Sequence, residues 1–184
     1  QAALYSPFLF DEIIEQGQYL RQLVALADDI RQRASDRPVG VVDAGCNVGL
    51  FPLFAQAVFG RPVHAFGFEP LAMNCELAHL NWQQLHSHNL YGVCLGAEFA
   101  AQQPFHLTSS TGSTLLQAEA DMWEHETGQP TPQVAHIDVQ PLDAFHSVEH
   151  VDVFKLDVEG SEQQVLEGAA ATIARDRPWI ICSY

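Results

Sequence analysis

The sequence predicts an α/β domain with a mostly parallel central sheet and helices on both faces. Three observations indicate this class: short apolar runs rich in β-branched residues, helix-period segments that alternate with them, and glycine or acidic residues where the runs end. Uninterrupted apolar strands are typical of parallel sheets that are covered on both faces. Their alternation with helical segments favours strand–helix–strand connections.

The elements follow in order. Residues 8–34 carry apolar side chains at helical spacing, divided by Gly17, and a polar linker at 31–38 ends at Pro38. We expect core strands at residues 39–44, 63–68, 90–95, 151–158 and 179–182. We expect core helices at residues 50–59, 71–85 and 161–175. Pro52 suits the first turn of its helix, where a missing N–H is tolerated, and Ser161 suits an N-cap.

Residues 97–140 interrupt this alternation. Short strands are expected at 105–107 and 134–139, with a polar stretch at 108–114 and an acidic one around Asp121, Glu124 and Glu126 between them. Long insertions of this kind are typical of lids, binding loops or disorder. The prediction is a single Rossmann-like domain over 1–184: amino-terminal helices and linker at 1–38, and a cofactor-binding core at 39–184 with the insertion at 97–140.

The charge balance excludes some partners. The chain has 23 acidic and 8 basic side chains, a formal net charge of −15, and Lys155 is its one lysine. Binding to nucleic-acid backbone or to anionic membrane requires clustered cations, so neither is expected. The apolar share of 47% argues for a folded protein instead of an acidic disordered tail.

The cysteines indicate a reducing compartment. Cys46, Cys75, Cys94 and Cys182 form no CxxC pair and no regular framework, so buried thiols in a cytoplasmic protein are expected. The sequence shows no metal-ligand cluster, no apolar run long enough to span a bilayer and no signal-peptide pattern at its start. A homo-oligomer is compatible with the sequence but is not indicated by it.

The first chemical motif is the turn after the first strand, Asp43-Ala44-Gly45-Cys46-Asn47-Val48-Gly49. Glycines at the carboxyl end of a strand allow a ligand to approach the backbone closely. A dinucleotide site favours GxGxxG, and the middle glycine is missing here. An acid just before the first glycine suits the cationic sulfonium and ammonium of S-adenosylmethionine, although a turn without a ligand is the alternative.

The second motif, Gly67-Phe68-Glu69-Pro70, ends the second strand. A carboxylate at this place can accept both hydroxyls of an adenosine ribose. Nicotinamide and S-adenosylmethionine sites share this device, so Glu69 predicts a nucleoside cofactor of either kind. A solvated acid at a strand end is the alternative interpretation.

The third motif, Lys155-Leu156-Asp157-Val158-Glu159-Gly160-Ser161-Glu162, ends the fourth strand. Strand periodicity puts Lys155 and Asp157 on one face, where their charges need partners. Asp157, Glu159 and Glu162 could bind a cation, orient a substrate hydroxyl or accept its proton. Lys155 is a candidate for catalysis, and the simpler interpretation is that it ties neighbouring carboxylates together.

Taken together, VVDAGCNVG, GFEP and FKLDVEGSEQQVLEGA resemble the FkbM-type family of S-adenosylmethionine-dependent methyltransferases. Smaller matches are Gln16 to Tyr19, Asn74 and Asn81, Ser113 to Leu115, and Pro141 to Asp143. The resemblance covers about residues 10–184 and implies a class I methyltransferase fold. It also implies methylation of a hydroxyl on a small molecule, a sugar or a secondary metabolite. The class I fold continues beyond a fifth strand, so an excerpted chain, truncated after that strand, is expected.

The resemblance implies roles for particular residues. Asp43, Gly45, Asn47 and Gly49 would line the methionine part of the cofactor, Glu69 would hold the ribose, and the backbone at Cys94 to Gly96 would flank the adenine. Asp157 and Glu159 would face the transferred methyl group. The candidate site also includes three neighbours of these positions: Cys46, Pro70 and Asn74.

Two alternative functions stay open from the sequence. One is a cofactor-binding or scaffold domain without catalytic activity. The other is a nicotinamide-dependent oxidoreductase, which the missing central glycine and the LDVEG segment disfavour.

Overall fold

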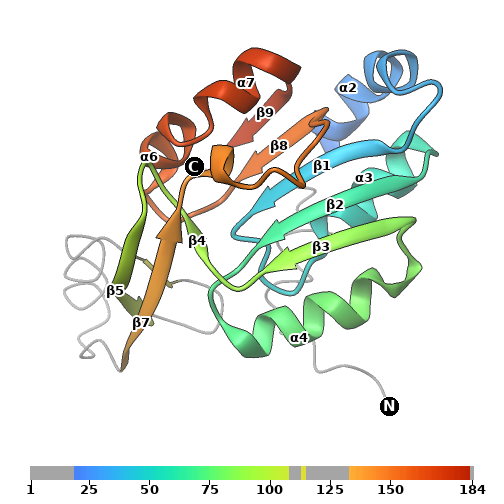
Figure 1. Ribbon diagram of the computed structural model, residues 1–184. Helices are drawn as coiled ribbons and strands as arrows, with labels where there is room; N and C mark the ends of the chain where they lie inside the picture. Colours follow the sequence, from blue (N-terminus) through green and yellow to red (C-terminus); the bar gives the residue numbers. More distant parts are fainter. Residues whose placement is uncertain (1–18, 108–112, 115–132, 183–184) are drawn as a thin grey trace.

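The central sheet of this computed structural model has five parallel strands, in the order β3 (Ser87–Tyr91), β2 (Val63–Phe68), β1 (Val39–Ala44), β8 (Val153–Leu156) and β9 (Trp179–Cys182). The structure describes residues 19–107, 113–114 and 133–182. Figure 1 shows the arrowheads of the five strands at one edge of the sheet. We refer to this as the carboxyl edge and to the opposite one as the amino edge. The parallel α/β class predicted from the sequence is confirmed.

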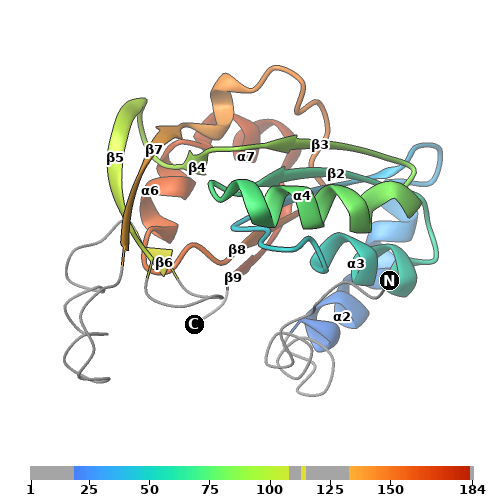
Figure 2. The ribbon, with the colours of Figure 1, turned by 90° about the horizontal axis from the view of Figure 1, so that it is seen from below.

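Helices cover both faces of the sheet (Figure 2). On one face lie α2 (Leu20–Arg33), α3 (Phe51–Phe59), α4 (Ala72–Asn81) and the short 3₁₀ helix η2 (Trp82–Gln84). On the other face lie η3 (Leu142–Ala144), α6 (Glu162–Glu167) and α7 (Ala170–Asp176). Val41 packs into the first layer and Val42 into the second, so β1 is buried on both faces as its continuous apolar run predicts.

The insertion forms a second sheet. Its strands lie in the order β4 (Cys94–Leu95), β7 (Gln133–Gln140), β5 (Ala100–Leu107) and β6 (Ser113–Thr114). β5 and β7 are antiparallel and longer than the short strands expected at 105–107 and 134–139. The expected features at Gly17, at residues 108–112 and at Asp121, Glu124 and Glu126 lie outside the described residues.

The strand expected at 90–95 is wrong. The chain instead forms β3, ending at Tyr91, and β4, starting at Cys94, which belong to different sheets. The first residues of β3 are polar because this edge strand is only half-buried. The sequence therefore has no apolar run there that would predict a strand. The bend at Gly92 and Val93 takes the chain out of the central sheet, so Cys94 pairs with Val139 in the second sheet.

The last core helix also differs from its expectation at 161–175. It is divided into α6 and α7, and a Cβ at Gly168, between them, would lie 1.9 Å from the Gly96 carbonyl oxygen. Glycine permits this close approach of two backbones at the point where the helix divides. Ser161 is the N-cap of α6, but its side chain makes no capping hydrogen bond. The helix expected at 71–85 comprises α4 and η2, and the fourth strand is shorter than 151–158.

Candidate functional site

The three motifs meet at the carboxyl edge of the central sheet. The turn after β1 and Glu69 after β2 are joined by backbone hydrogen bonds, in which the Gly45 and Cys46 N–H groups both donate to the Phe68 carbonyl. β8 places Asp157 against the same turn, since the Asp157 N–H donates to the Ala44 carbonyl. Ligands of parallel α/β sheets bind at this edge, so the geometry matches the expected place of a cofactor site.

The turn after β1 has a left-handed backbone at three of five positions. Gly45, Asn47 and Gly49 have φ of 69°, 48° and 76°. Glycine takes this conformation without strain, and asparagine tolerates it better than most residues. A Cβ on Gly45 would lie 2.0 Å from the Asp157 carbonyl oxygen, so the glycine permits the close approach of β1 and β8.

Two side chains at the end of α4 and the start of η2 support this turn. The Asn81 amide donates to the Val48 carbonyl at 2.7 Å, and the indole N–H of the fully buried Trp82 donates to the Gly49 carbonyl at 2.6 Å. A Cβ on Gly49 would lie 2.5 Å from that indole nitrogen. Trp82 was not among the residues predicted for the site, and its spacing from the turn gives no local signal for this contact.

Glu69 is a buried carboxylate that already has three protein donors. Its Oε2 accepts the Asn47 N–H at 3.0 Å, and its Oε1 accepts the Leu71 N–H at 3.0 Å and the Asn74 amide at 3.3 Å. Burial raises the pKa of Glu69, and these hydrogen bonds oppose that effect. The carboxylate is thereby oriented by the turn on one side and by the start of α4 on the other.

Lys155 and Asp43 form a buried ion pair between register partners on β8 and β1. The Lys155 Nζ lies 3.0 Å from Asp43 Oδ1, and it donates to the Gly45 carbonyl at 2.8 Å. Beyond this ion pair, neither carboxylate oxygen of Asp43 has a hydrogen-bond partner among the described residues. Burial raises the pKa of Asp43, and Lys155 opposes that effect.

The same ammonium reaches Asp157. Lys155 Nζ lies 3.6 Å from Asp157 Oδ2, and the Asp157 side chain is 36% exposed. Burial alone would lower the pKa of Lys155, but Asp43 and Asp157 outweigh it and raise that pKa. Lys155 therefore stays charged and joins a buried carboxylate to a solvent-accessible one, which is the tie between carboxylates that the sequence suggested.

Glu159 and Glu162 differ in their surroundings. Glu159 is exposed and has a left-handed φ of 50° in the turn after β8. Glu162 Oε1 accepts the Val158 N–H at 3.2 Å and the Gly160 N–H at 3.4 Å, so this side chain closes the turn before α6. Within the described ranges, no group of three or more His, Cys, Asp or Glu side chains is arranged to hold a metal ion.

The remaining candidates lie around Glu69. Burial, followed by the nearby Glu69 carboxylate, raises the pKa of Cys94 to about 12, and burial also raises that of Cys46. Both thiols therefore stay protonated and unreactive. A Cβ on Gly96 would lie 2.5 Å from the Val139 side chain, so this glycine accommodates the second sheet. Pro70 follows Glu69 and precedes α4. Contacts of Cys46, Pro70, Cys94 and Gly96 with a cofactor stay predictions.

The fold and the site define the class: a Rossmann-like α/β domain with acidic and glycine-bearing turns at the carboxyl edge of its sheet. The sequence matches the Methyltransferase FkbM domain family over residues 43–184. The chain therefore belongs to the FkbM methyltransferase family.

A solved structure shows the same fold. The crystal structure of Methyltransferase FkbM from Methylobacillus flagellatus KT superposes with a TM-score of 0.55 at 18% sequence identity. The similarity covers 79% of this chain and 32% of that one, so this chain spans about a third of the length of its structural neighbour. No curated protein matches the sequence. None of the described helices has the length and apolar character needed to cross a membrane.

Proposed function

We propose that this domain is an S-adenosylmethionine-dependent methyltransferase that transfers the methyl group to a hydroxyl of a small molecule. Membership of the FkbM methyltransferase family supports the reaction type. The observation that carries the choice of a hydroxyl acceptor is Asp157, a partly exposed carboxylate at the carboxyl edge, held by Lys155 beside the turn after β1. An alcohol is a poor nucleophile at neutral pH, and a carboxylate in this place can take its proton.

The residues at the carboxyl edge fit the cofactor. Glu69, Asp43 and Asp157 put three carboxylates and one ammonium, Lys155, around the turn after β1, and the excess of negative charge suits a cationic ligand. In this proposal the turn from Gly45 to Gly49 holds the methionine part, Glu69 the ribose, and the backbone at Cys94 to Gly96 the adenine. When bound, the cofactor supplies an electrophilic methyl carbon on sulfur.

The ribose contact requires a small rearrangement. A carboxylate offers about four acceptor positions, and protein donors take three of those on Glu69. Oε2 has room for one hydroxyl, whereas Oε1 already has two donors. The Asn74 amide makes the longest of the three bonds, at 3.3 Å, so it is the donor that would turn away to admit the second hydroxyl.

The transfer moves a proton from the acceptor hydroxyl to the protein and a methyl group to the acceptor oxygen. The proton of the acceptor hydroxyl passes to Asp157, with Glu159 as the second candidate. The acceptor oxygen would then bond to the methyl carbon, and the carbon–sulfur bond would break with its electron pair on sulfur. Lys155 holds Asp157 in place for this step, so its proposed role in catalysis is through Asp157.

The experiment has two stages. Calorimetry with S-adenosylmethionine and with NAD should show binding of the first alone. The protein is then incubated with S-adenosylmethionine and a panel of free sugars, nucleotide-linked sugars and phenols, each beside its amine analogue. Mass spectrometry should find a gain of one CH₂ on hydroxyl compounds. Methylated amines alone would contradict a hydroxyl acceptor, and cofactor binding without any transfer would favour an inactive domain.

We also propose a compartment for the reaction and a charge class for its acceptor. The four cysteines are free thiols, which supports a reducing compartment such as the cytoplasm. The net charge of −15 supports an uncharged or cationic acceptor over a polyanion such as nucleic acid.

A further inference from the structure

Tyr19 connects the amino-terminal part of the chain to the carboxyl edge. This residue directly precedes α2 and is 3% exposed. Its hydroxyl donates a hydrogen bond of 2.7 Å to Asp157 Oδ2 across a separation of 138 residues. Tyr19 also lies before residue 43, where the match to the methyltransferase family begins.

The tyrosine ring is fixed by its neighbours. It packs edge-on against Phe51, with ring centroids 5.3 Å apart and planes at 83°, and the Lys155 ammonium lies 5.9 Å from its centroid. Tyr19 belongs to the core layer formed with α2 and α3. A ring held in this way brings its hydroxyl to Asp157 at little cost in side-chain entropy.

Two groups therefore act on the same oxygen of Asp157. Tyr19 donates to Oδ2, and Lys155 approaches Oδ2 at 3.6 Å. Lys155 is also paired with the buried carboxylate of Asp43. Contacts on one carboxylate oxygen set the rotation of the whole group, and they therefore decide the direction of the other oxygen, Oδ1.

We propose that Tyr19 is a positioning residue of the methyl-transfer site. Its hydroxyl holds Asp157 Oδ2 so that Oδ1 faces the acceptor and receives the hydroxyl proton. The acceptor oxygen then bonds to the methyl carbon, and sulfur keeps the electron pair of the broken carbon–sulfur bond. The inference rests on the proposed function and adds that the segment before the family-matched region completes the site.

The test removes the hydroxyl and keeps the ring. In Tyr19→Phe, turnover with the best acceptor of the panel should fall about tenfold, the loss expected for one hydrogen bond to a charged group. The dissociation constant of S-adenosylmethionine should change by less than about twofold, because the hydroxyl acts on Asp157 and the cofactor turn is unaltered. Thermal unfolding of each variant checks that the fold is retained.

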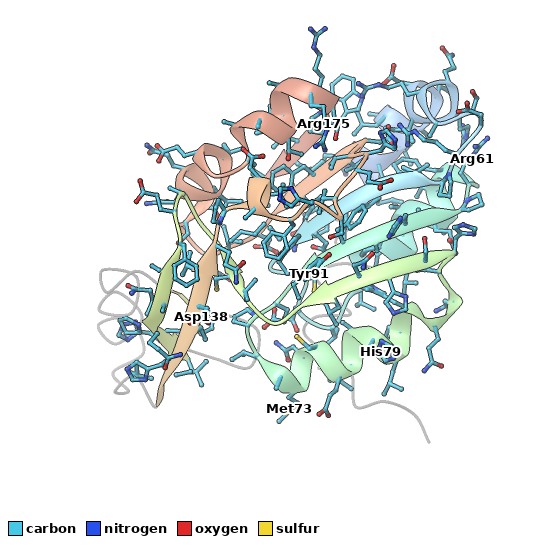
Figure 3. All side chains as sticks on the ribbon, in the orientation of Figure 1. Arg61, Met73, His79, Tyr91, Asp138 and Arg175 are labelled. Carbon is cyan, nitrogen blue, oxygen red and sulfur yellow. The ribbon has the colours of Figure 1, made fainter. Side chains whose placement is uncertain are left out.

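Tyr91→Phe is the matched control. Tyr91 lies at the end of β3 (Figure 3), where its hydroxyl is 2.5 Å from Ser147 Oγ. Its side chain packs in the other core layer, on the opposite face of the sheet from Tyr19. This variant loses the same kind of group and should retain wild-type turnover.

A double variant separates positioning from general loosening of the structure. If Tyr19 acts through Asp157, Tyr19→Phe should produce no further loss in an Asp157→Asn background. The same tenfold loss in that background, or wild-type turnover in Tyr19→Phe alone, would overturn the inference. Failure of the proposed function looks different: the wild-type protein would methylate no hydroxyl, or Asp157→Asn would leave transfer unchanged.

Discussion

The two edges of the central sheet differ in how one buried carboxylate of each is paired. At the amino edge, arginines bond to the carbonyls where helices end: Arg31 donates to Val58 and Phe59 at the end of α3, each at 2.9 Å, and Arg61 donates to Ala34 after α2. Arginine at a helix carboxyl end satisfies free carbonyls and suits the helix dipole. Figure 3 labels Arg61 at this edge, far from the arrowheads.

The amino edge also holds a buried carboxylate with complete hydrogen bonding. Asp152 accepts two hydrogen bonds from Arg37, at 2.6 and 2.8 Å, and one from the Gly40 N–H at 2.9 Å. A cavity of about 250 Å³ lies beside this pair and is lined by Arg33, Arg37, His150, Val151, Asp152 and Asp176. Because the Arg37 and Asp152 charges satisfy each other, this end of the sheet has a structural role.

At the carboxyl edge, the buried carboxylate is less completely paired. Asp43 is as buried as Asp152, but its oxygens have no partner beyond the Lys155 ion pair within the described part of the chain. The neighbouring turn adopts a left-handed backbone at three positions. Unsatisfied buried polar groups are often found where a ligand binds, so the incomplete pairing of Asp43 supports the cofactor site proposed at the carboxyl edge.

The largest expected effect is at the turn. Gly49→Val introduces a Cβ 2.5 Å from the Trp82 indole nitrogen at a φ of 76°. Displacing the turn should weaken S-adenosylmethionine binding at least about 100-fold, which corresponds to about 2.7 kcal/mol. Calorimetry measures this, and wild-type affinity in a folded Gly49→Val protein would refute the assignment of the turn.

Gly60→Ala is the control for Gly49→Val. Gly60 also has a left-handed φ, 62°, but a Cβ there would meet no atom within 4 Å. The substitution should destabilise the fold by about 1–2 kcal/mol through backbone strain alone. Cofactor affinity should be unchanged.

The next effect concerns the buried cation of the carboxyl edge. Lys155→Met leaves two carboxylates without their cation, one of them fully buried, so the free energy of unfolding should fall by about 3–5 kcal/mol. Urea denaturation measures the loss. Adding Asp43→Asn should recover part of it, and a full loss in the double variant would contradict the pairing.

The same lysine predicts the alkaline limit of the fold. The pKa of Lys155 is raised in the folded state above its ordinary value of 10.5, so its stabilisation is complete below that pH and is lost as the pH rises through the folded value. Urea denaturation between pH 9 and about 12 should show no decline from this lysine below about pH 10.5 and a growing decline above it. Buried thiols such as Cys94 contribute in the same direction, so the lysine part is the difference from Lys155→Met. Equal slopes in the two proteins would contradict the assignment.

At the amino edge the expected effect is smaller and is confined to stability. Arg37→Met removes a bidentate partner from Asp152, which retains the Gly40 N–H and gains access to water through the vacated space. We expect a loss of about 1–3 kcal/mol in the free energy of unfolding. Cofactor affinity and turnover should match the wild type, and a selective loss of either would contradict a purely structural amino edge.

The sequence was most informative where the chain is buried on both sides. The strands at 39–44, 63–68 and 179–182 were predicted with the bounds observed, because proline or glycine flanks apolar runs that few other structures accommodate. The three motifs of the carboxyl edge were also located, since glycines and acids after such strands are local signals.

The rest depends on contacts distant in sequence. Gly168 approaches Gly96 at the break between α6 and α7, and the turn after β1 is supported by Trp82. Tyr19 reaches Asp157 only after α2 has packed against the sheet. No local sequence pattern predicts these contacts, so they can be identified only in the folded structure.

The central claim is that Asp157 accepts the acceptor proton at an edge built to hold the cofactor. Its most direct test is Asp157→Asn, measured for both turnover and S-adenosylmethionine affinity. We predict that turnover falls about 100-fold or more, the contribution expected of a general base, while the dissociation constant of the cofactor stays within about threefold. Unchanged turnover, or a loss explained by weaker cofactor binding, would contradict the account.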